Sequence, residues 1–163
     1  MYKPRVYVET TIPSFYHTTR TSAFCLARRE WTRRWWDDHG SEFERVTSRA
    51  VFDELSRGNY PSRDAALALI RDLPRLQTSP AIRDILATYF RNRLMPADPG
   101  GDALHLALAS YHRCDFLLTW NCRHLANARK FDHIQRVNAA LGLIVPTLVT
   151  PMELLGEDDG KDY

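Results

Sequence analysis

Short apolar stretches alternate with longer segments of helical periodicity along this chain, and that alternation most limits the folds available to it. Four stretches have the length and composition of strands: residues 5–9, 43–48, 115–120 and 144–149. Strands that are separated by helices pair in parallel, because each helix carries the chain back across the sheet. The pattern therefore predicts an α/β domain with a central parallel sheet, and Pro146 places the last strand at an edge.

Polar residues and glycines mark the ends of the predicted helices. Ser22, Ser48 and Ser62 suit N-cap positions, and Gly40 and Gly58 suit positions that end helices. With the apolar periodicity, these signals predict helices over residues 23–40, 49–58, 63–73, 82–94, 101–113 and, with a break, 121–142, followed by a capping box at 150–153.

The first of these helices has an apolar face that we expect to pack in the core. Phe24, Ala27, Trp31 and Trp35 recur at helical spacing on that face. Trp36 points elsewhere, since adjacent helical residues do not share a face. It is therefore the better candidate for contact with a partner protein.

Length and composition are those of one ordinary globular domain. The chain has 163 residues, of which 44% are hydrophobic and 26% charged. Residues 1–155 are predicted to form one domain and 156–163 an acidic, disordered tail. No apolar run is long enough to span a membrane and no secretory signal is visible, so we expect a cytoplasmic protein. The three cysteines show no CxxC spacing, which argues against a disulfide framework or a zinc site.

The charge distribution is compatible with a nucleic-acid substrate. Of the 22 basic residues, 19 are arginines, and the planar guanidinium group binds phosphate through two parallel hydrogen bonds. The segment from Glu153 to Tyr163 carries five acids and one lysine, so the rest of the chain carries +6 within the total of +2. Arginines also coat solvated helices in many proteins, so the charge alone does not identify the substrate.

Polar side chains flank the predicted strands at positions that would meet at one edge of the sheet. The set comprises Glu9, after the first strand; Glu54, in the helix after the second; Asp102, at the start of the helix before the third; and Asn121, after that strand. Ligands of parallel sheets bind at the carboxyl ends of the strands. Three carboxylates and one amide suit Mg²⁺, which prefers oxygen ligands. The sequence contains no GxxxxGK[ST] phosphate loop and no GxSxG motif.

Each of these residues also has a purely structural explanation. Glu9 could cap the following turn, Asp102 could complement the N-terminus of its helix, and Asn121 could cap the helix that follows. Positions 53–54 hold an aspartate and a glutamate, of which one is expected to face solvent. His105, one turn after Asp102, is more typical of a core histidine than of a site neighbour.

Four segments carry a resemblance to a known family. They are VYVETTIPSFY (6–16), TSRAVFDEL (47–55), GDALHLALASYHRCDFLLTWNCRHLAN (101–127) and TPMELL (150–155). In this order they resemble the PIN domain, and specifically the VapC-type toxins of bacterial toxin–antitoxin pairs. The resemblance implies a three-layer α/β/α fold and Mg²⁺- or Mn²⁺-dependent ribonuclease activity. It also implies an RNA substrate, a cognate antitoxin and a homodimer.

The resemblance assigns the metal ligands and catalytic positions to four residues: Glu9, Glu54, Asp102 and Asn121. The family more often has aspartate where this chain has Glu9 and Asn121. Glu9 keeps the negative charge on a longer side chain. Asn121 removes one charge and leaves a cluster of −3, which weakens the case for a second metal ion but not for the first.

Three further residues are expected to support the acids or contact the substrate: Thr10, Thr119 and His124. The sequence therefore predicts a metal-dependent endoribonuclease. The main alternative is a non-catalytic PIN-like module that binds RNA or an antitoxin, which the asparagine at position 121 favours and the three retained acids oppose. A metal-dependent phosphatase or DNA nuclease is a third possibility.

Overall fold

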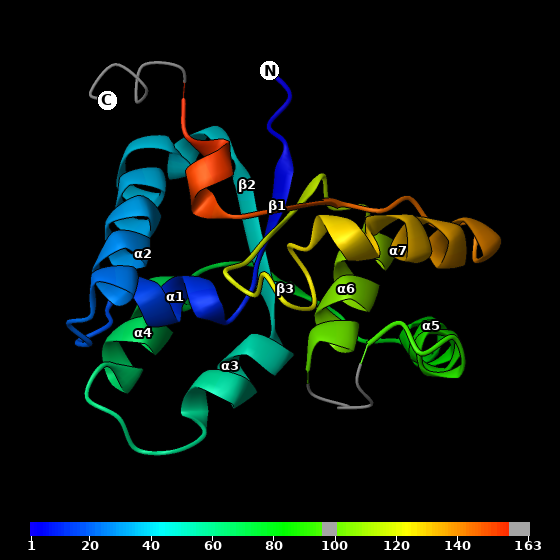
Figure 1. Ribbon diagram of the computed structural model, residues 1–163, viewed down its shortest axis with the longest axis horizontal. Coiled ribbons are helices and arrows are strands. Elements are labelled where there is room, and N and C mark those ends of the chain that lie inside the picture. Colours follow the sequence, from blue (N-terminus) through cyan, green and yellow to red (C-terminus); the bar gives the residue numbers. More distant parts are fainter. Residues whose placement is uncertain (96–100, 157–163) are drawn as a thin grey trace.

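A five-stranded parallel sheet forms the centre of the computed structural model, which describes residues 1–95 and 101–156 (Figure 1). Its strands are β1 (Arg5–Val8), β2 (Glu44–Ser48), β3 (Arg75–Leu76), β4 (Phe116–Leu118) and β5 (Thr147–Val149). They lie in the order β3-β2-β1-β4-β5, and every neighbouring pair is parallel. The four predicted strands are confirmed, with β5 at an edge, whereas the sequence pattern does not predict the two-residue β3.

Helices cover both faces of the sheet and give the three-layer α/β/α arrangement that the sequence predicts. One face carries α1 (Thr11–Tyr16), α2 (Ala23–Arg34), α3 (Arg49–Ser56) and α4 (Arg63–Ile70). The other face carries α5 (Pro80–Arg91), α6 (Asp102–Tyr111) and α7 (Ala128–Ala140). Figure 1 shows the two groups on opposite sides of the strands. The predicted helices are confirmed, while α1 is additional and α7 begins after a series of turns.

The strand order reverses direction between β1 and β4. From β1 the chain builds the sheet outward through β2 and β3, and then returns to add β4 and β5 on the other side of β1. The connections on the two sides therefore leave the sheet on opposite faces, which opens a crevice beyond the carboxyl ends of β1 and β4. Val8 pairs with Leu118 in the sheet, so the next residues, Glu9 and Thr119, lie side by side at that crevice.

The apolar face predicted for α2 is only partly the buried one. Trp35 is fully buried, as expected, but Phe24 is 59% exposed. Cys25 and Thr32 face the core instead. Thr32 is drawn inward because its hydroxyl accepts a hydrogen bond of 2.8 Å from the indole N–H of Trp120. The helix is therefore rotated from the orientation that its large apolar residues suggest.

Trp36, the predicted contact for a partner protein, is half-buried. It lies in a π-helical turn (Trp35–His39) that continues α2 and leads into a 3₁₀ turn (Gly40–Glu42). The Arg45 guanidinium lies 4.6 Å from the centre of its ring. Its indole thus already has contacts within the chain.

The end of the described chain is fixed by the predicted capping box. The Thr150 side chain and the Glu153 carboxylate close the 3₁₀ turn Pro151–Leu154, and the Thr150 N–H donates to Glu153 over 3.0 Å. The predicted acidic tail from residue 157 onward lies outside the described residues. Across residues 1–95 and 101–156, no helix has both the length and the apolar character that a membrane span requires.

Candidate active site

Glu9 directly follows β1 and is almost completely buried, with 3% of its surface exposed. One carboxylate oxygen accepts a 2.7 Å hydrogen bond from the Thr11 backbone N–H. The other accepts from the Thr11 hydroxyl at 2.9 Å and from the Thr119 hydroxyl at 2.7 Å. Glu9 therefore both caps the start of α1 and stands at the strand ends, so the two explanations suggested by the sequence hold together.

Burial raises the pKa of Glu9 above its ordinary value of 4.5. The charge of His105 and the hydrogen bonds from Thr119 and Thr11 act in the opposite direction, without cancelling the effect of burial. The shift of Glu9 therefore comes from burial and not from repulsion by the other acids. A cation at this position would favour the ionised carboxylate.

Glu54 is the last residue in a chain of hydrogen bonds that runs from Ser48 through Tyr7 of β1 and His105. The Tyr7 hydroxyl lies 2.7 Å from Ser48 Oγ and 2.6 Å from His105 Nδ1. His105 Nε2 lies 2.8 Å from Glu54 Oε1, and the Thr10 hydroxyl donates to Glu54 Oε2 over 2.7 Å. Both oxygens of Glu54 are thus held in place, one from α6 and one from the start of α1.

Asp102 is held by Asn121 across the crevice. Asn121 Nδ2 donates to Asp102 Oδ2 over 2.8 Å. Asn121 Oδ1 accepts from the backbone N–H groups of Arg123 and His124 at 3.2 and 3.0 Å. The amide therefore caps the turn after β4 with its oxygen and presents its N–H, rather than its oxygen, to the carboxylate.

His105 connects the three acids electrostatically. It is 1% exposed, and burial by itself would lower the pKa of its imidazole. The hydrogen bond to Glu54 and the charges of Glu54, Glu9 and Asp102 outweigh burial and raise that pKa above its ordinary value of 6.5. The buried imidazole thus contacts Glu54 directly and also feels the charges of Glu9 and Asp102.

The other predicted residues fall into two groups. Thr10 and Thr119 contact acids of the cluster directly, although Thr10 binds Glu54 rather than its neighbour Glu9. His124 reaches the cluster only through its backbone N–H to Asn121, while its ring nitrogen Nδ1 lies 3.4 Å from the Lys130 ammonium.

The adjacent acids Asp53 and Glu54 have different surroundings in the structure. The Asp53 side chain is 61% exposed and lies 3.9 Å from Arg49 on the outer face of α3. The Glu54 side chain is 21% exposed, and its carboxylate lies 2.8 Å from His105 Nε2. Asp53 is therefore the solvated member of the pair, and a natural control for Glu54.

Three residues of the site stand outside the set named from the sequence: Tyr7, Thr11 and His105. The sequence does contain a signal for two of them. Tyr7 and Glu9 are two apart on an extended segment, and Asp102 and His105 are three apart on a helix, so each pair shares a face. The alternatives of core residue and site neighbour are not exclusive for His105, because the site lies at the edge of the core.

The donor atoms of the site fit a hard divalent cation. Glu9, Glu54 and Asp102 supply carboxylate oxygens, and hydroxyl and amide donors orient them as such ligands require. In the described part of the chain, neither Glu9 nor Asp102 forms an ion pair with lysine or arginine. The same residues contain no trio of His, Cys, Asp or Glu side chains already spaced as a metal-binding group. The acids would need to close in on a bound ion.

Comparison with known proteins does not assign this site to a family. No protein-family model matches the chain, and a search of curated proteins finds no similar sequence. The resemblance to PIN domains thus stays a prediction from sequence.

Proposed function

We propose that this protein is a metal-dependent endoribonuclease of the PIN type. One observation carries the proposal: buried His105 contacts Glu54 and also feels the charges of Glu9 and Asp102, and within the described residues neither Glu9 nor Asp102 pairs with a lysine or an arginine. Burying a charge is costly, and burial raises the pKa of Glu9, so a cation beside Glu9 would favour its ionised carboxylate. Parallel sheets bind their ligands at this edge.

In the proposed reaction, Glu9, Glu54 and Asp102 hold one Mg²⁺ or Mn²⁺ ion. A divalent ion at that position supplies positive charge to a phosphate oxygen and makes water more acidic. Thr119 and Thr11 hold the carboxylate of Glu9, and His105 and Thr10 hold that of Glu54. Asn121 fixes Asp102 through a neutral N–H, so it steadies the site without adding a fourth negative charge.

An RNA phosphodiester is the proposed substrate, for two reasons. The body of the chain is basic and rich in arginine, which suits a polyanion. Single-stranded RNA presents splayed bases that can enter a crevice beside the acids, unlike the stacked bases of a duplex. The cytoplasm, expected from the sequence, is the proposed compartment.

The partners follow from the same resemblance and are part of the proposal. A toxin of the VapC type pairs with a cognate antitoxin that blocks its active crevice, and forms a homodimer. Size-exclusion chromatography with light scattering tests the dimer: a mass near twice 18.9 kDa supports it, and a monomer at all concentrations contradicts it.

Cleavage of single-stranded RNA tests the activity. The purified protein is incubated with fluorescent RNA in Mg²⁺, Mn²⁺ or EDTA, beside Asp102→Asn prepared in the same way. We expect cleavage that needs metal, is absent in the variant, and leaves 5′-phosphate and 3′-hydroxyl ends. Equal cleavage by both proteins, or cleavage that persists in EDTA, contradicts the proposal.

A second candidate function is a binding module that no longer cleaves. The hydrogen bond from Asn121 to Asp102 favours it, because it gives that carboxylate a partner without a metal. The buried Glu9 opposes it, since it has hydroxyl and N–H donors but no cation beyond His105. RNA that binds the protein tightly and stays intact in both Mg²⁺ and Mn²⁺ would support this second function.

A further inference from the structure

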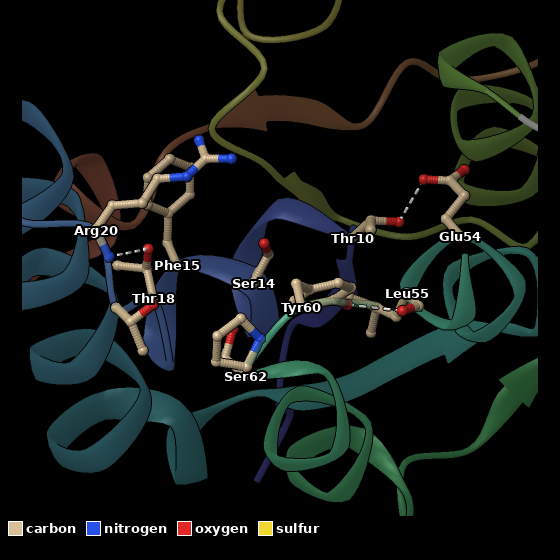
Figure 2. Close-up of a pocket in the computed structure, with 11 residues that line it drawn as sticks. Thr10, Ser14, Phe15, Thr18, Arg20, Glu54, Leu55, Tyr60 and Ser62 are labelled. Atoms are coloured by element: carbon tan, nitrogen blue, oxygen red, sulfur yellow. Dashed lines mark hydrogen bonds between the residues drawn. The ribbon is translucent and has the colours of Figure 1, made fainter. Parts of the chain in front are cut away.

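A pocket of about 400 Å³ lies directly beside Glu54, between α1 with the loop that follows it and α3 with the loop that follows that helix. Thr10 and Glu54 line one side of this pocket, and Arg20 lines the opposite side, as Figure 2 shows. Its volume is in the range of small-molecule sites. The pocket therefore joins the acid cluster to a basic residue on the surface.

Several polar groups in the pocket have no partner. Within the described residues, the Arg20 guanidinium forms no hydrogen bond or ion pair; only its backbone N–H is bonded, to Thr18 Oγ1. The hydroxyl of Ser14, which Figure 2 shows in the middle of the pocket, is likewise free of hydrogen bonds there. These groups are available to a phosphate and a sugar.

The apolar part of the pocket is rigid and aromatic. The Tyr60 hydroxyl donates to the Leu55 carbonyl over 2.7 Å, which fixes that ring at the wall. Phe15 packs edge-on against Trp120, with ring centres 6.4 Å apart. The Arg28 guanidinium lies 5.3 Å from the Phe15 ring. The pocket lining thus includes two aromatic residues that contacts within the chain hold in place.

We propose that this pocket binds one nucleotide of a single-stranded RNA, next to the phosphodiester at the acid cluster. Arg20 binds the phosphate on the far side of that nucleotide, Ser14 hydrogen-bonds its sugar, and Phe15 and Tyr60 contact its base. The inference rests on the proposed function, because that function sets where the cleaved bond lies. The inference adds the identity of the arginine and the aromatic rings that contact the RNA.

The chemistry of the walls favours RNA over a protein segment. A peptide that binds in a groove relies on a mainly apolar lining or a free sheet edge. This pocket instead combines hydroxyls, one free guanidinium and two rings, which is the combination that single-stranded nucleic acid requires. Without a metal ion, Glu54 at the inner end repels phosphate, so in the metal-free protein Arg20 is the position for the phosphate of this nucleotide.

Binding of a fluorescein-labelled, single-stranded 12-nucleotide RNA, measured by anisotropy in EDTA across several salt concentrations, tests the inference. Arg20→Gln should weaken binding about tenfold and reduce the slope of log affinity against log salt by about 0.7, the value for one phosphate contact on a single strand. Arg83→Gln, on the exposed face of α5, should change neither quantity.

A second pair of variants tests the pocket itself. Ser14→Phe fills the space and should weaken RNA binding at least about tenfold, whereas Ser14→Ala leaves it open and should cost about twofold at most. Thermal melts check that all four proteins fold. Equal affinity and equal salt slope for wild type, Arg20→Gln and Ser14→Phe overturn the inference, and would leave the pocket to a protein partner.

The pocket inference and the ribonuclease proposal fail on different results. If wild type cleaves RNA and Arg20→Gln binds and cleaves it equally well, the pocket inference fails while the proposed function stands. If no protein cleaves RNA but Arg20→Gln and Ser14→Phe lose binding, the pocket inference stands and the ribonuclease proposal fails.

Discussion

At the scale of single residues, Asn121 has the largest effect on the charge of the site. Its N–H donates to Asp102 and its oxygen caps the turn after β4. An aspartate could keep the capping bonds, since its oxygens accept as well as an amide oxygen does. It would, however, place a second carboxylate against Asp102.

The Asn121→Asp variant should therefore depend on metal for its stability. Without metal, we expect a loss of about 1–3 kcal/mol in the free energy of unfolding, because a hydrogen bond is replaced by repulsion between like charges. With Mg²⁺ or Mn²⁺, the loss should shrink, since the added charge is a further ligand. Urea unfolding with EDTA and with metal measures both values.

Asn127→Asp is the matched control for that variant. Asn127 caps α7 by accepting from the Arg129 N–H at 3.0 Å, and its Nδ2 donates to the Arg123 carbonyl over 2.9 Å. Aspartate keeps the cap and loses the donated bond without meeting another carboxylate, so the control should lose at most about 1 kcal/mol and show no response to metal beyond that of wild type. A stability of Asn121→Asp that equals wild type in EDTA would contradict the arrangement of this pair.

His105 should make the metal-free protein less stable as the pH rises. Its pKa is raised above 6.5 in the folded state by Glu54, Glu9 and Asp102, against the effect of burial. The resulting stabilisation is fully present below the pKa of the unfolded chain and is lost as pH rises through the folded pKa. The raised pKa of Glu9 likewise makes the folded state less stable as the pH rises from 4.5, the ordinary value, through the folded pKa.

Urea unfolding in EDTA at about pH 6 and about pH 8 measures this dependence. We expect wild type to be more stable at the lower pH, and His105→Gln to show a smaller difference between the two. Wild-type stability that increases over this interval would contradict the protonated pairing of His105 with the acids.

At the scale of helices and strands, the sequence predicts elements better than it predicts their faces. Caps and glycines mark helix ends through local chemistry, so α2 does start after Ser22, whose hydroxyl accepts from the Cys25 N–H at 3.2 Å. The buried face of α2 depends on Trp120, far along the chain, which needs Thr32 as a hydrogen-bond acceptor. A hydrogen bond between residues so far apart in the sequence produces no local pattern of apolar and polar residues. For the same reason β3, held by only two paired positions, escapes prediction.

The same limit applies to the site: the sequence predicts which residues follow strands, but not which side chains contact one another. Glu9 and Asn121 are recognisable because they follow strands, and strand ends in parallel sheets meet at one edge. Thr10 is named from the sequence for its closeness to Glu9, yet it contacts Glu54, because α1 turns it toward α3. Which hydroxyl reaches which acid depends on how helices pack, and one sequence does not contain that information.

Loss of the α2 cap should destabilise the protein without altering the acids. Ser22→Ala removes the acceptor for Cys25 N–H and should cost about 1 kcal/mol. Ser22→Asp keeps an acceptor and should restore most of that loss. Thermal denaturation of the three proteins measures the effect; an unchanged midpoint for Ser22→Ala would show that the cap contributes nothing.

At the scale of the whole molecule, the switch in strand order puts the site on the rim of the core. Tyr7 and His105 are as buried as the aliphatic residues around them, yet they lead directly to Glu54. A rigid sheet and two helical layers thus hold acids that would repel one another in a loose chain. This is why Glu9 can be almost completely buried and still lie at the strand ends.

The same packing predicts that one of the three cysteines reacts in the folded protein. Cys25 and Cys114 are buried, and Cys122 is exposed next to Asn121. Burial raises the pKa of Cys114 to about 12, so its thiolate is scarce at pH 8. Ellman's reagent should label one thiol quickly in the native state and three after unfolding. Two fast thiols in the native protein would contradict the packing around Cys25 or Cys114.

The most direct test of the central claim is isothermal titration of Mn²⁺ into the metal-free protein. We expect wild type to bind Mn²⁺, Glu54→Gln to bind it at least about tenfold more weakly, and Asp53→Asn to match wild type. The two variants make the same change, one residue apart, in the crevice and on the solvent face of α3. No Mn²⁺ binding by wild type, or equal weakening by both variants, would contradict a metal site at the carboxyl ends of β1 and β4.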